Sequence, residues 1–140
     1  MSAVEAGLRQ PTVAPLAEVL DGHPPLDSTT INAWEDLNFV AAVRATGRRK
    51  LVMAALWTEM CLAFPALDAL REGFEVYPVT DAVAGTSVEA HRAALERVVQ
   101  AGAQPITWAS LAGELQRDWA RAETAGDVRR IVIEERLAKD

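Results

Sequence analysis

The stretch that decides the fold is Leu51–Cys61, LVMAALWTEMC. It opens with six apolar residues, and the basic turn Gly47–Lys50 precedes it. A short apolar run next to a turn is typical of a strand buried on both faces of a parallel sheet. After Trp57 an apolar stripe at helical spacing runs to Gly73, with Thr58 as the expected N-cap. The only cysteine is therefore predicted to lie in the first turn of a helix, just beyond the carboxyl end of a strand.

This predicted position has chemical consequences for Cys61. The free N–H groups and the partial positive charge at a helix start favour a thiolate, and they can also stabilise an oxyanion. Pro65 lies four residues later and has no N–H group, so the helix is expected to bend just past the cysteine. A buried cysteine that acts only as a small apolar side chain is the simpler alternative.

The rest of the chain predicts strands that alternate with helices. Such an order forms parallel βαβ units, so the predicted fold class is α/β, a three-layer α-β-α arrangement with a parallel, Rossmann-like sheet. Residues 1–30 are expected to be a Pro-containing arm or loop, and residues 31–140 the α/β domain. The predicted elements are a short helix Leu16–Leu20, a helix from Glu35 or Asp36 to Thr46, a strand Phe74–Val79, a helix Val88–Gln100 capped by Ser87, a strand from Pro105 to Trp108 or Ala109, a helix Leu111–Ala122 with Leu115 and Trp119 facing inward, and a last segment Val128–Leu137, for which helix is favoured over strand.

Composition excludes several classes of function. The formal net charge of −6 argues against nucleic acid as a partner, because binding phosphates needs a basic face. No apolar run is long enough to span a membrane, and no signal-peptide pattern is present. One cysteine suits the reducing cytoplasm, where we expect the protein. Two scattered histidines and one cysteine predict no metal site, and no cofactor is expected.

Three motifs carry a resemblance to a known family. They are Asn32-Ala33-Trp34, Thr58-Glu59-Met60-Cys61 and Val79-Thr80-Asp81-Ala82. Together with the segments around them, from Pro15 to Arg121, they resemble the isochorismatase-like cysteine hydrolases, and most of all the bacterial branch of that superfamily. The three motifs are specific in combination, although each is weak alone.

The resemblance implies a mechanism and a set of residues. In that family the cysteine is the nucleophile, here Cys61, and it attacks small amides or related carbonyl compounds. The oxyanion hole is implied to consist of the backbone N–H groups of Cys61 and Trp57, with a cis peptide bond between Leu56 and Trp57. Pocket positions follow in the same way for Asn32, Trp34 and Thr58.

The sequence departs from the family pattern at two catalytic positions. The chain has no segment that resembles the family's first strand and its aspartate. Where the family has a lysine or arginine, this chain reads Asp27-Ser28-Thr29-Thr30, and Lys50 would enter the nucleophile strand at the far end from Cys61. Residues 31–140 therefore resemble the C-terminal portion of the family domain, as in an N-terminally truncated member that lacks the first strands of the sheet. We expect strongly reduced or absent turnover.

Loss of the first strand would expose one edge of the nucleophile strand, residues 51–56. An apolar edge of this kind invites pairing, so we expect either the N-terminal arm or a second copy of the chain to cover it. A homo-oligomer that acts on a small-molecule substrate is the main interpretation. The alternative is a non-catalytic oligomeric or partner-binding remnant of the same fold.

The residue types in the chain also allow a different catalytic set, a triad that contains a histidine. His91 and Asp81 could form a Cys-His-Asp triad with Cys61, but only geometry identifies such triads. Because the family does not use a histidine in this way, a structural or surface role for His91 is favoured.

Overall fold

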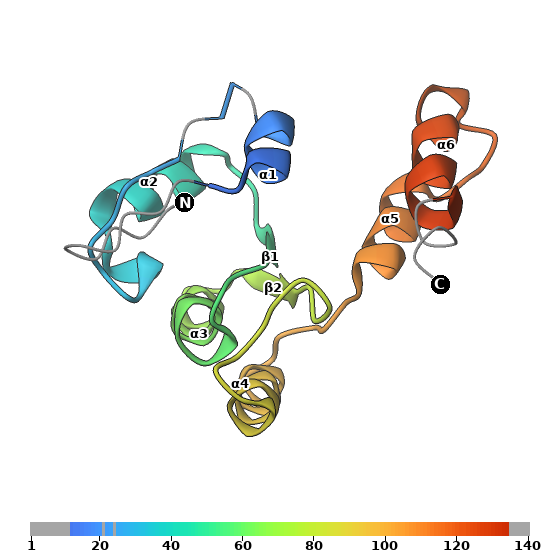
Figure 1. The fold of residues 1–140 in the computed structure, drawn as a ribbon. Helices are drawn as coiled ribbons and strands as arrows, with labels where there is room; N and C mark the ends of the chain where they lie inside the picture. Colours follow the sequence, from blue (N-terminus) through green and yellow to red (C-terminus); the bar gives the residue numbers. More distant parts are fainter. Residues whose placement is uncertain (1–11, 21, 24, 135–140) are drawn as a thin grey trace.

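The computed structural model of the protein describes residues 12–20, 22–23 and 25–134. Within them, strand β1 (Lys50–Met53) pairs in parallel with strand β2 (Glu75–Pro78), and Leu51 lies opposite Val76. Helix α3 connects the two strands, so they form a βαβ unit, and the predicted α/β class is confirmed. In Figure 1, α1 and α2 lie above the strands and α3 and α4 below them. The described residues contain the α-helices α1 (Ala14–Val19), α2 (Leu37–Ala45), α3 (Ala63–Arg71), α4 (Val88–Gln100), α5 (Trp108–Gln116) and α6 (Ala122–Arg129).

Local capping explains where several helices begin and end. The Ser87 hydroxyl accepts a hydrogen bond from the Ala90 N–H at 3.1 Å, so α4 begins at its predicted residue. The Asp36 carboxylate accepts from two backbone N–H groups at the start of α2. Gly47 follows α2 with φ of +64° and, as predicted, ends that helix, because glycine adopts this conformation without a steric penalty.

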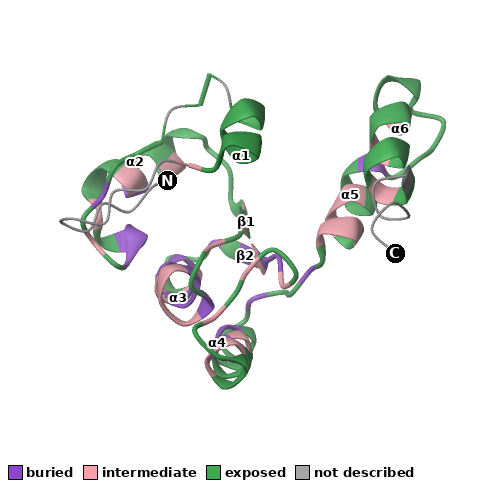
Figure 2. Ribbon diagram, in the orientation of Figure 1, coloured by how far each residue is buried: buried purple, intermediate pink, exposed green. Residues whose placement is uncertain are grey.

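The hydrophobic core lies where α3 and α4 pack against β2. Val76 of β2 and Val98 of α4 have no exposed surface. The Trp34 ring, in a short 3₁₀ turn (Ala33–Glu35), packs edge-on against Phe74 with ring centroids 5.4 Å apart. Figure 2 shows the buried residues concentrated on α3 and the segments next to it. Small residues let these elements approach closely, namely Ala63, Ala66, Ala69 and Ala94.

Strand β1 is shorter and more exposed than the sequence predicts. It covers Lys50–Met53 rather than residues 51–56, and Val52 is 52% exposed. Within the described residues its only strand neighbour is β2, and no strand among them pairs with its other edge. The prediction of a strand buried on both faces is therefore wrong for a single copy of the chain. The expectation of an exposed edge agrees with the structure.

The predicted third strand is reduced to a single parallel bridge between Ile106 and Val79. Pro105 has no N–H group to donate, and the Thr107 hydroxyl already caps α5. The Pro78 carbonyl accepts from the Ile106 N–H at 3.0 Å. The N–H and C=O of a strand residue point to the same side, so the N–H group that proline lacks would also have faced this segment. Pro78 thus interrupts the hydrogen bonding of β2 on the side of residues 104–106, an inner position of the sheet.

The helix predicted for Leu111–Ala122 is found as α5 but ends at Gln116, and the next helix, α6, begins at Ala122. The chain reverses at Arg117, which has φ of +60°, and α5 and α6 form a hairpin. The buried Gln116 side chain holds the turn, since its amide donates to the Asp118 and Arg121 carbonyls. A π turn (Arg130–Glu134) continues α6, so the helix favoured for residues 128–137 is found up to residue 134, and residues 135–137 lie outside the described part.

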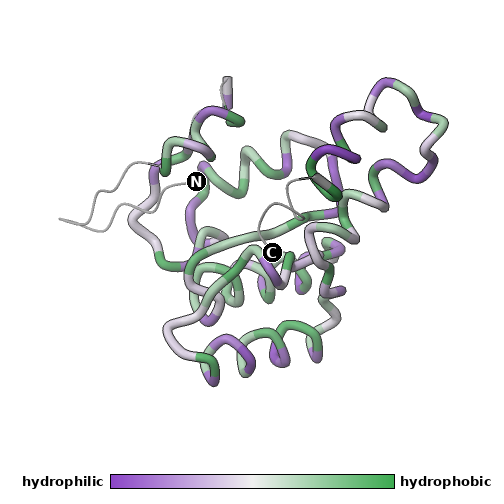
Figure 3. Tube along the Cα trace, turned by 45° about the vertical axis from the view of Figure 1, so that its right-hand side comes forward, coloured by the Kyte–Doolittle hydropathy of each residue, from purple (hydrophilic) through white to green (hydrophobic). Residues whose placement is uncertain are grey.

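We call residues 108–134 the C-terminal arm. Figure 1 shows the arm projecting away from the α/β body, and Figure 3 shows hydrophobic residues interspersed with polar ones along it. Leu115 is 69% exposed and Trp119 is 62% exposed, so the prediction that both face inward is wrong. Their inward assignment assumed one helix packed on the sheet, whereas α5, which carries Leu115, projects away from the sheet, and the chain reverses at Arg117 before it reaches Trp119. No helix in the described part is long and apolar enough to cross a bilayer.

The contrast between Val76 and Val52 gives a test of this core. We expect Val76→Ala to lower the free energy of unfolding by about 2 kcal/mol, because it removes buried methyl groups and leaves a cavity. Val52→Ala removes the same groups from a half-exposed strand position, so we expect a loss under about 1 kcal/mol. Urea unfolding followed by circular dichroism measures both. Equal losses would contradict the described core.

Candidate active site

Cys61 lies in a π turn (Thr58–Leu62) that connects the end of β1 to α3. The Met60 and Leu62 N–H groups both donate to the Trp57 carbonyl, each at 3.3 Å, and the cysteine is half-buried. The predicted placement of Cys61, in the first turn after the strand, is thus confirmed, and its role as nucleophile stays a prediction. The bend expected from Pro65 takes the form of this wider turn, because an α-helical hydrogen bond from residue 65 to the Cys61 carbonyl needs the N–H that proline lacks.

The peptide bond between Leu56 and Trp57 is cis, at the place that the family resemblance implies. It lies directly before the π turn. In the described residues the Trp57 N–H has no hydrogen-bond acceptor. An amide group without a partner, one turn before the cysteine, is the kind of donor that an oxyanion hole requires.

Thr58 is fully buried, and it connects the turn to α4. Its hydroxyl lies 2.9 Å from Nδ1 of His91, and its N–H donates to the Ala84 carbonyl at 2.9 Å. The prediction that this hydroxyl caps the helix by accepting from Met60 or Cys61 is therefore wrong. Trp57 occupies the N-cap position, and the side chain of Thr58 points instead toward α4.

Glu59 makes the second connection from the turn. Its Oε1 atom accepts from the Thr86 N–H at 2.9 Å and from the Thr86 hydroxyl at 2.6 Å. These two hydrogen bonds lower the pKa of Glu59, and the nearby His91 ring adds a smaller effect in the same direction. The Oε2 atom is buried and has no hydrogen-bond partner among the described residues. Glu59 therefore does more than complement the helix dipole from the first turn: it also ties the turn to Thr86.

The alternative Cys-His-Asp triad is not assembled. Oδ1 of Asp81 accepts from the Trp108 N–H at 2.9 Å, so this carboxylate caps the start of α5. The His91 ring pairs with Thr58 instead. This geometry agrees with the favoured structural role of His91. Across the described residues, no three histidine, cysteine or carboxylate side chains gather as metal ligands.

Asn32 and Trp34 lie against the second half of α3. The Asn32 amide donates to Oδ2 of Asp68 at 2.7 Å, and the Trp34 indole N–H donates to Oε1 of Glu72 at 2.9 Å. At 1.5 Å per helical residue, Asp68 is about 10 Å along the axis from Cys61, and Glu72 about 16 Å. The structure thus groups both residues with the contact between α2 and α3, and their pocket role stays a prediction.

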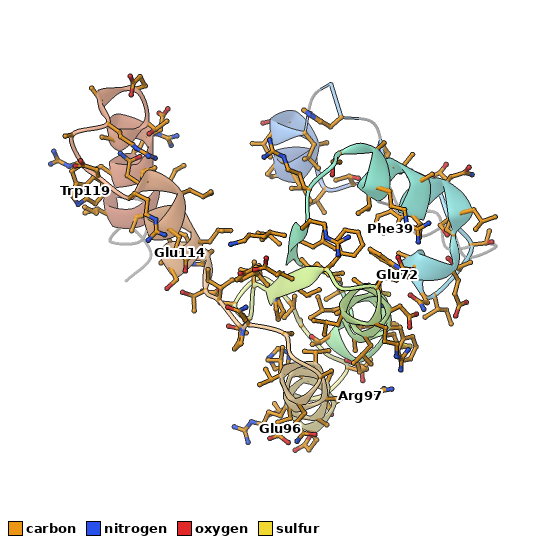
Figure 4. All side chains as sticks on the ribbon, turned by 180° about the vertical axis from the view of Figure 1, so that it is seen from behind. Phe39, Glu72, Glu96, Arg97, Glu114 and Trp119 are labelled. Carbon is orange, nitrogen blue, oxygen red and sulfur yellow. The ribbon has the colours of Figure 1, made fainter. Side chains whose placement is uncertain are left out.

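Glu72 is the centre of a polar network that the sequence did not reveal. It lies between α2 and α3, as Figure 4 shows. Arg44 donates to its Oε2 atom at 2.7 Å, and hydrogen bonds from Arg44 and then Trp34 lower the pKa of Glu72. No local pattern marks such a contact between helices, and the same holds for the pairs Thr58–His91 and Glu59–Thr86.

Several known proteins are similar to this chain in sequence and in fold. The isochorismatase domain family matches residues 1–110. The probable hydrolase YcaC of Escherichia coli (strain K12) is 54% identical over 90 residues, which cover 64% of this chain and 43% of that protein. The chain spans less than half the length of the curated relatives that it matches.

Solved structures extend the likeness to the arm. The crystal structure of the Escherichia coli YcaC gene product, an octameric hydrolase of unknown specificity, matches with a TM-score of 0.87 and 38% identity over 96% of this chain and 67% of that one. YcaC from Pseudomonas aeruginosa, with hexane-2,5-diol and covalent acrylamide, matches with a TM-score of 0.82 and 39% identity over 89% of this chain and 63% of that one. The nicotinamidase/pyrazinamidase PncA of Bacillus subtilis has a TM-score of 0.60 and 26% identity, covering 69% of this chain and 55% of its own.

The lowered pKa of Glu59 predicts a pH-dependent contribution to stability. A carboxylate whose pKa is lower in the folded state stabilises the fold above its unfolded pKa, and this stabilisation is lost as the pH falls through the folded value. We expect Glu59→Gln to destabilise the protein at pH 7 and the difference from wild type to shrink below about pH 4. Urea unfolding at several pH values measures this. Glu96→Gln, on the outer side of α4, is the control for removing a carboxylate (Figure 4). A penalty for Glu59→Gln that stays constant down to pH 3 would contradict the role of the Thr86 contacts.

Proposed function

We propose that this chain, which belongs to the isochorismatase family, is a cysteine hydrolase of small amides or related carbonyl compounds. The observation that carries the proposal is the position of Cys61, in a π turn beyond the carboxyl end of β1. The carboxyl ends of parallel strands are where α/β proteins bind ligands. We also infer a cytoplasmic location, where a reactive free thiol stays reduced.

The reaction proceeds through a covalent intermediate on Cys61. The thiolate sulfur attacks the carbonyl carbon and forms a C–S bond, while the N–H groups of Trp57 and Cys61 hold the oxyanion. The C–N bond then breaks, and the nitrogen leaves as the amine with an added proton. Water attacks the thioester, the C–S bond breaks, and the carboxylic acid leaves as the thiol is restored. The net reaction converts an amide and water into an acid and an amine.

Two relatives support this chemistry. A nicotinamidase/pyrazinamidase shares the fold at 26% identity, and its name specifies small aromatic amides. The Pseudomonas aeruginosa relative carries covalent acrylamide, an electrophile that reacts with nucleophiles such as thiolates. Both facts favour a nucleophile in this fold and a small uncharged amide as its substrate.

The rate is expected to be low. The sequence shows neither the family's aspartate nor its basic residue, and no lysine or arginine occurs between Gln10 and Phe39. A positioned general acid or base contributes about 10² to 10⁴ in rate. We therefore propose turnover at least about 100-fold below that of relatives that carry the complete set.

Covalent labelling and turnover test the role of Cys61. We expect acrylamide to modify Cys61 faster in the folded protein than in urea-unfolded protein, as followed by intact mass, because only the folded turn presents the activating N–H groups. We also expect slow ammonia release from nicotinamide and pyrazinamide that Cys61→Ala abolishes.

The control for labelling is Cys61→Ala, which has no thiol, since Cys61 is the only cysteine. Labelling of the folded chain at or below the unfolded rate would refute the nucleophile assignment. Rapid labelling without ammonia release would instead favour the alternative function, a non-catalytic oligomeric remnant of the fold.

We further infer that the chain forms a homo-oligomer through its C-terminal arm. The arm packs extensively only within itself among the described elements, and it exposes Leu115 and Trp119, the latter away from the body (Figure 4). The octameric relative overlays 96% of this chain, a share too large to omit the arm. Burial of the exposed apolar side chains of this hairpin against a second copy of the chain would stabilise the assembly. The second copy can also cover the open edge of β1.

Charged substitutions in the arm test this assembly. We expect Leu115→Glu with Trp119→Glu to lower the oligomer mass in analytical ultracentrifugation and leave the circular dichroism spectrum of the body unchanged, because both side chains are exposed in the single chain. Leu37→Glu, an equally exposed apolar position on α2, is the matched control and should keep the wild-type mass. A wild-type chain that sediments as a monomer would refute the inference.

A further inference from the structure

The segment after β2 is joined to the cysteine turn by backbone contacts. We call residues 84–86 the clamp loop and residues 58–62 the nucleophile turn. Leu56 forms a parallel bridge with Ala84, and the Thr58 N–H donates to the Ala84 carbonyl at 2.9 Å. The clamp loop therefore lies beside the nucleophile turn, between it and the start of α4.

A carboxylate completes this junction. Glu59, two residues before the cysteine, accepts two hydrogen bonds from Thr86, at 2.9 Å from its N–H and 2.6 Å from its hydroxyl. Hydrogen bonds to an ionised acceptor are roughly twice as strong as bonds between neutral groups. The Glu59 side chain thus fixes the tip of the clamp loop on the turn that carries Cys61.

Gly85 makes room for this carboxylate. A Cβ atom on Gly85 would lie 2.8 Å from Oε2 of Glu59, 2.8 Å from the backbone N of His91 and 2.9 Å from its Cβ. Two of these three neighbours belong to α4, which cannot give way as a flexible side chain can. Space, rather than backbone conformation, excludes a side chain at Gly85.

The hydrogen bonds from Met60 and Leu62 inside the nucleophile turn are long, and the short ones, which Thr58 and Glu59 make, reach to α4 and the clamp loop. The Met60 and Leu62 N–H groups reach the Trp57 carbonyl only at 3.3 Å, the long end of the hydrogen-bond range. An oxyanion hole needs donors placed to within a few tenths of an ångström, and a displacement of about 1 Å costs on the order of 100-fold in rate. Contacts from outside the turn must therefore supply the precision.

We propose that Glu59 is a positioning residue for Cys61, which acts through Thr86 and the side-chain-free Gly85 to hold the nucleophile turn against the clamp loop. For its catalytic meaning this inference rests on the proposed cysteine chemistry. Its structural content concerns the reactivity of the Cys61 thiol, which is measurable without any turnover because the residue is half-exposed.

Two substitutions that retain the Glu59 charge test the proposal. Thr86→Val removes the hydroxyl donor, and Gly85→Ala displaces the carboxylate. For each we expect the second-order rate of Cys61 alkylation by iodoacetamide at pH 7.5 to fall about 10-fold, since the turn loses its fixed geometry. Thr86→Ser keeps the hydroxyl and should recover most of the rate lost in Thr86→Val. In a Glu59→Ala background, Thr86→Val should add little, because both changes break the same contact.

Two controls separate positioning from general stability. Ser87→Ala removes the α4 cap next to Thr86 and should lower the melting temperature without changing the alkylation rate. Gly113→Ala adds a methyl group where nothing lies within 4 Å and should leave the rate unchanged.

Alkylation rates of Thr86→Val and Gly85→Ala within twofold of wild type, or above it, would overturn the proposal. So would a fall in Ser87→Ala as large as that in Thr86→Val. Absence of amide turnover in wild type would concern the hydrolase proposal alone, because these comparisons of alkylation rates hold without it.

Discussion

The parallel pairing of β1 with β2 determines where the other parts of the site lie. Two parallel strands need a crossover between them, and here the crossover contains the π turn and α3. Cys61 is consequently delivered to the carboxyl ends of both strands, where the chain that leaves β2 also emerges. The clamp loop and Asp81 reach the cysteine's edge of the sheet for this reason, and the partners of Thr58 and Glu59 come from that segment.

Much of this arrangement is readable from the sequence, because the decisive signals are local. Ser87 predicts the start of α4, and Gly47 the end of α2. The apolar run after residue 50 predicts the strand that precedes Cys61, and the family motifs identify the fold. Each of these features is encoded within a few residues of the place where it acts.

The predictions that failed depend on contacts between distant residues. Leu115 and Trp119 have the spacing of an inward helical face, but α5 projects away from the sheet and the chain reverses at Arg117, so both are exposed. Thr58 has the sequence context of an N-cap, yet a histidine from α4 pairs with its hydroxyl. Residues 105–109 have the composition of a strand, but Pro105 and the cap at Thr107 leave room for only one bridge. Periodicity describes one element at a time and carries no information on its neighbours.

The cap that Asp81 provides at the start of α5 connects the arm to the sheet edge that presents Cys61. Helix α5, with nine residues, is about 13 Å long and acts as a lever with its fulcrum at this cap. A rotation of about 10° at the base moves the far end of α5 by about 2 Å. The arm therefore joins the body at the sheet edge that presents Cys61, through the Asp81 carboxylate and the hydrogen bonds of Ile106.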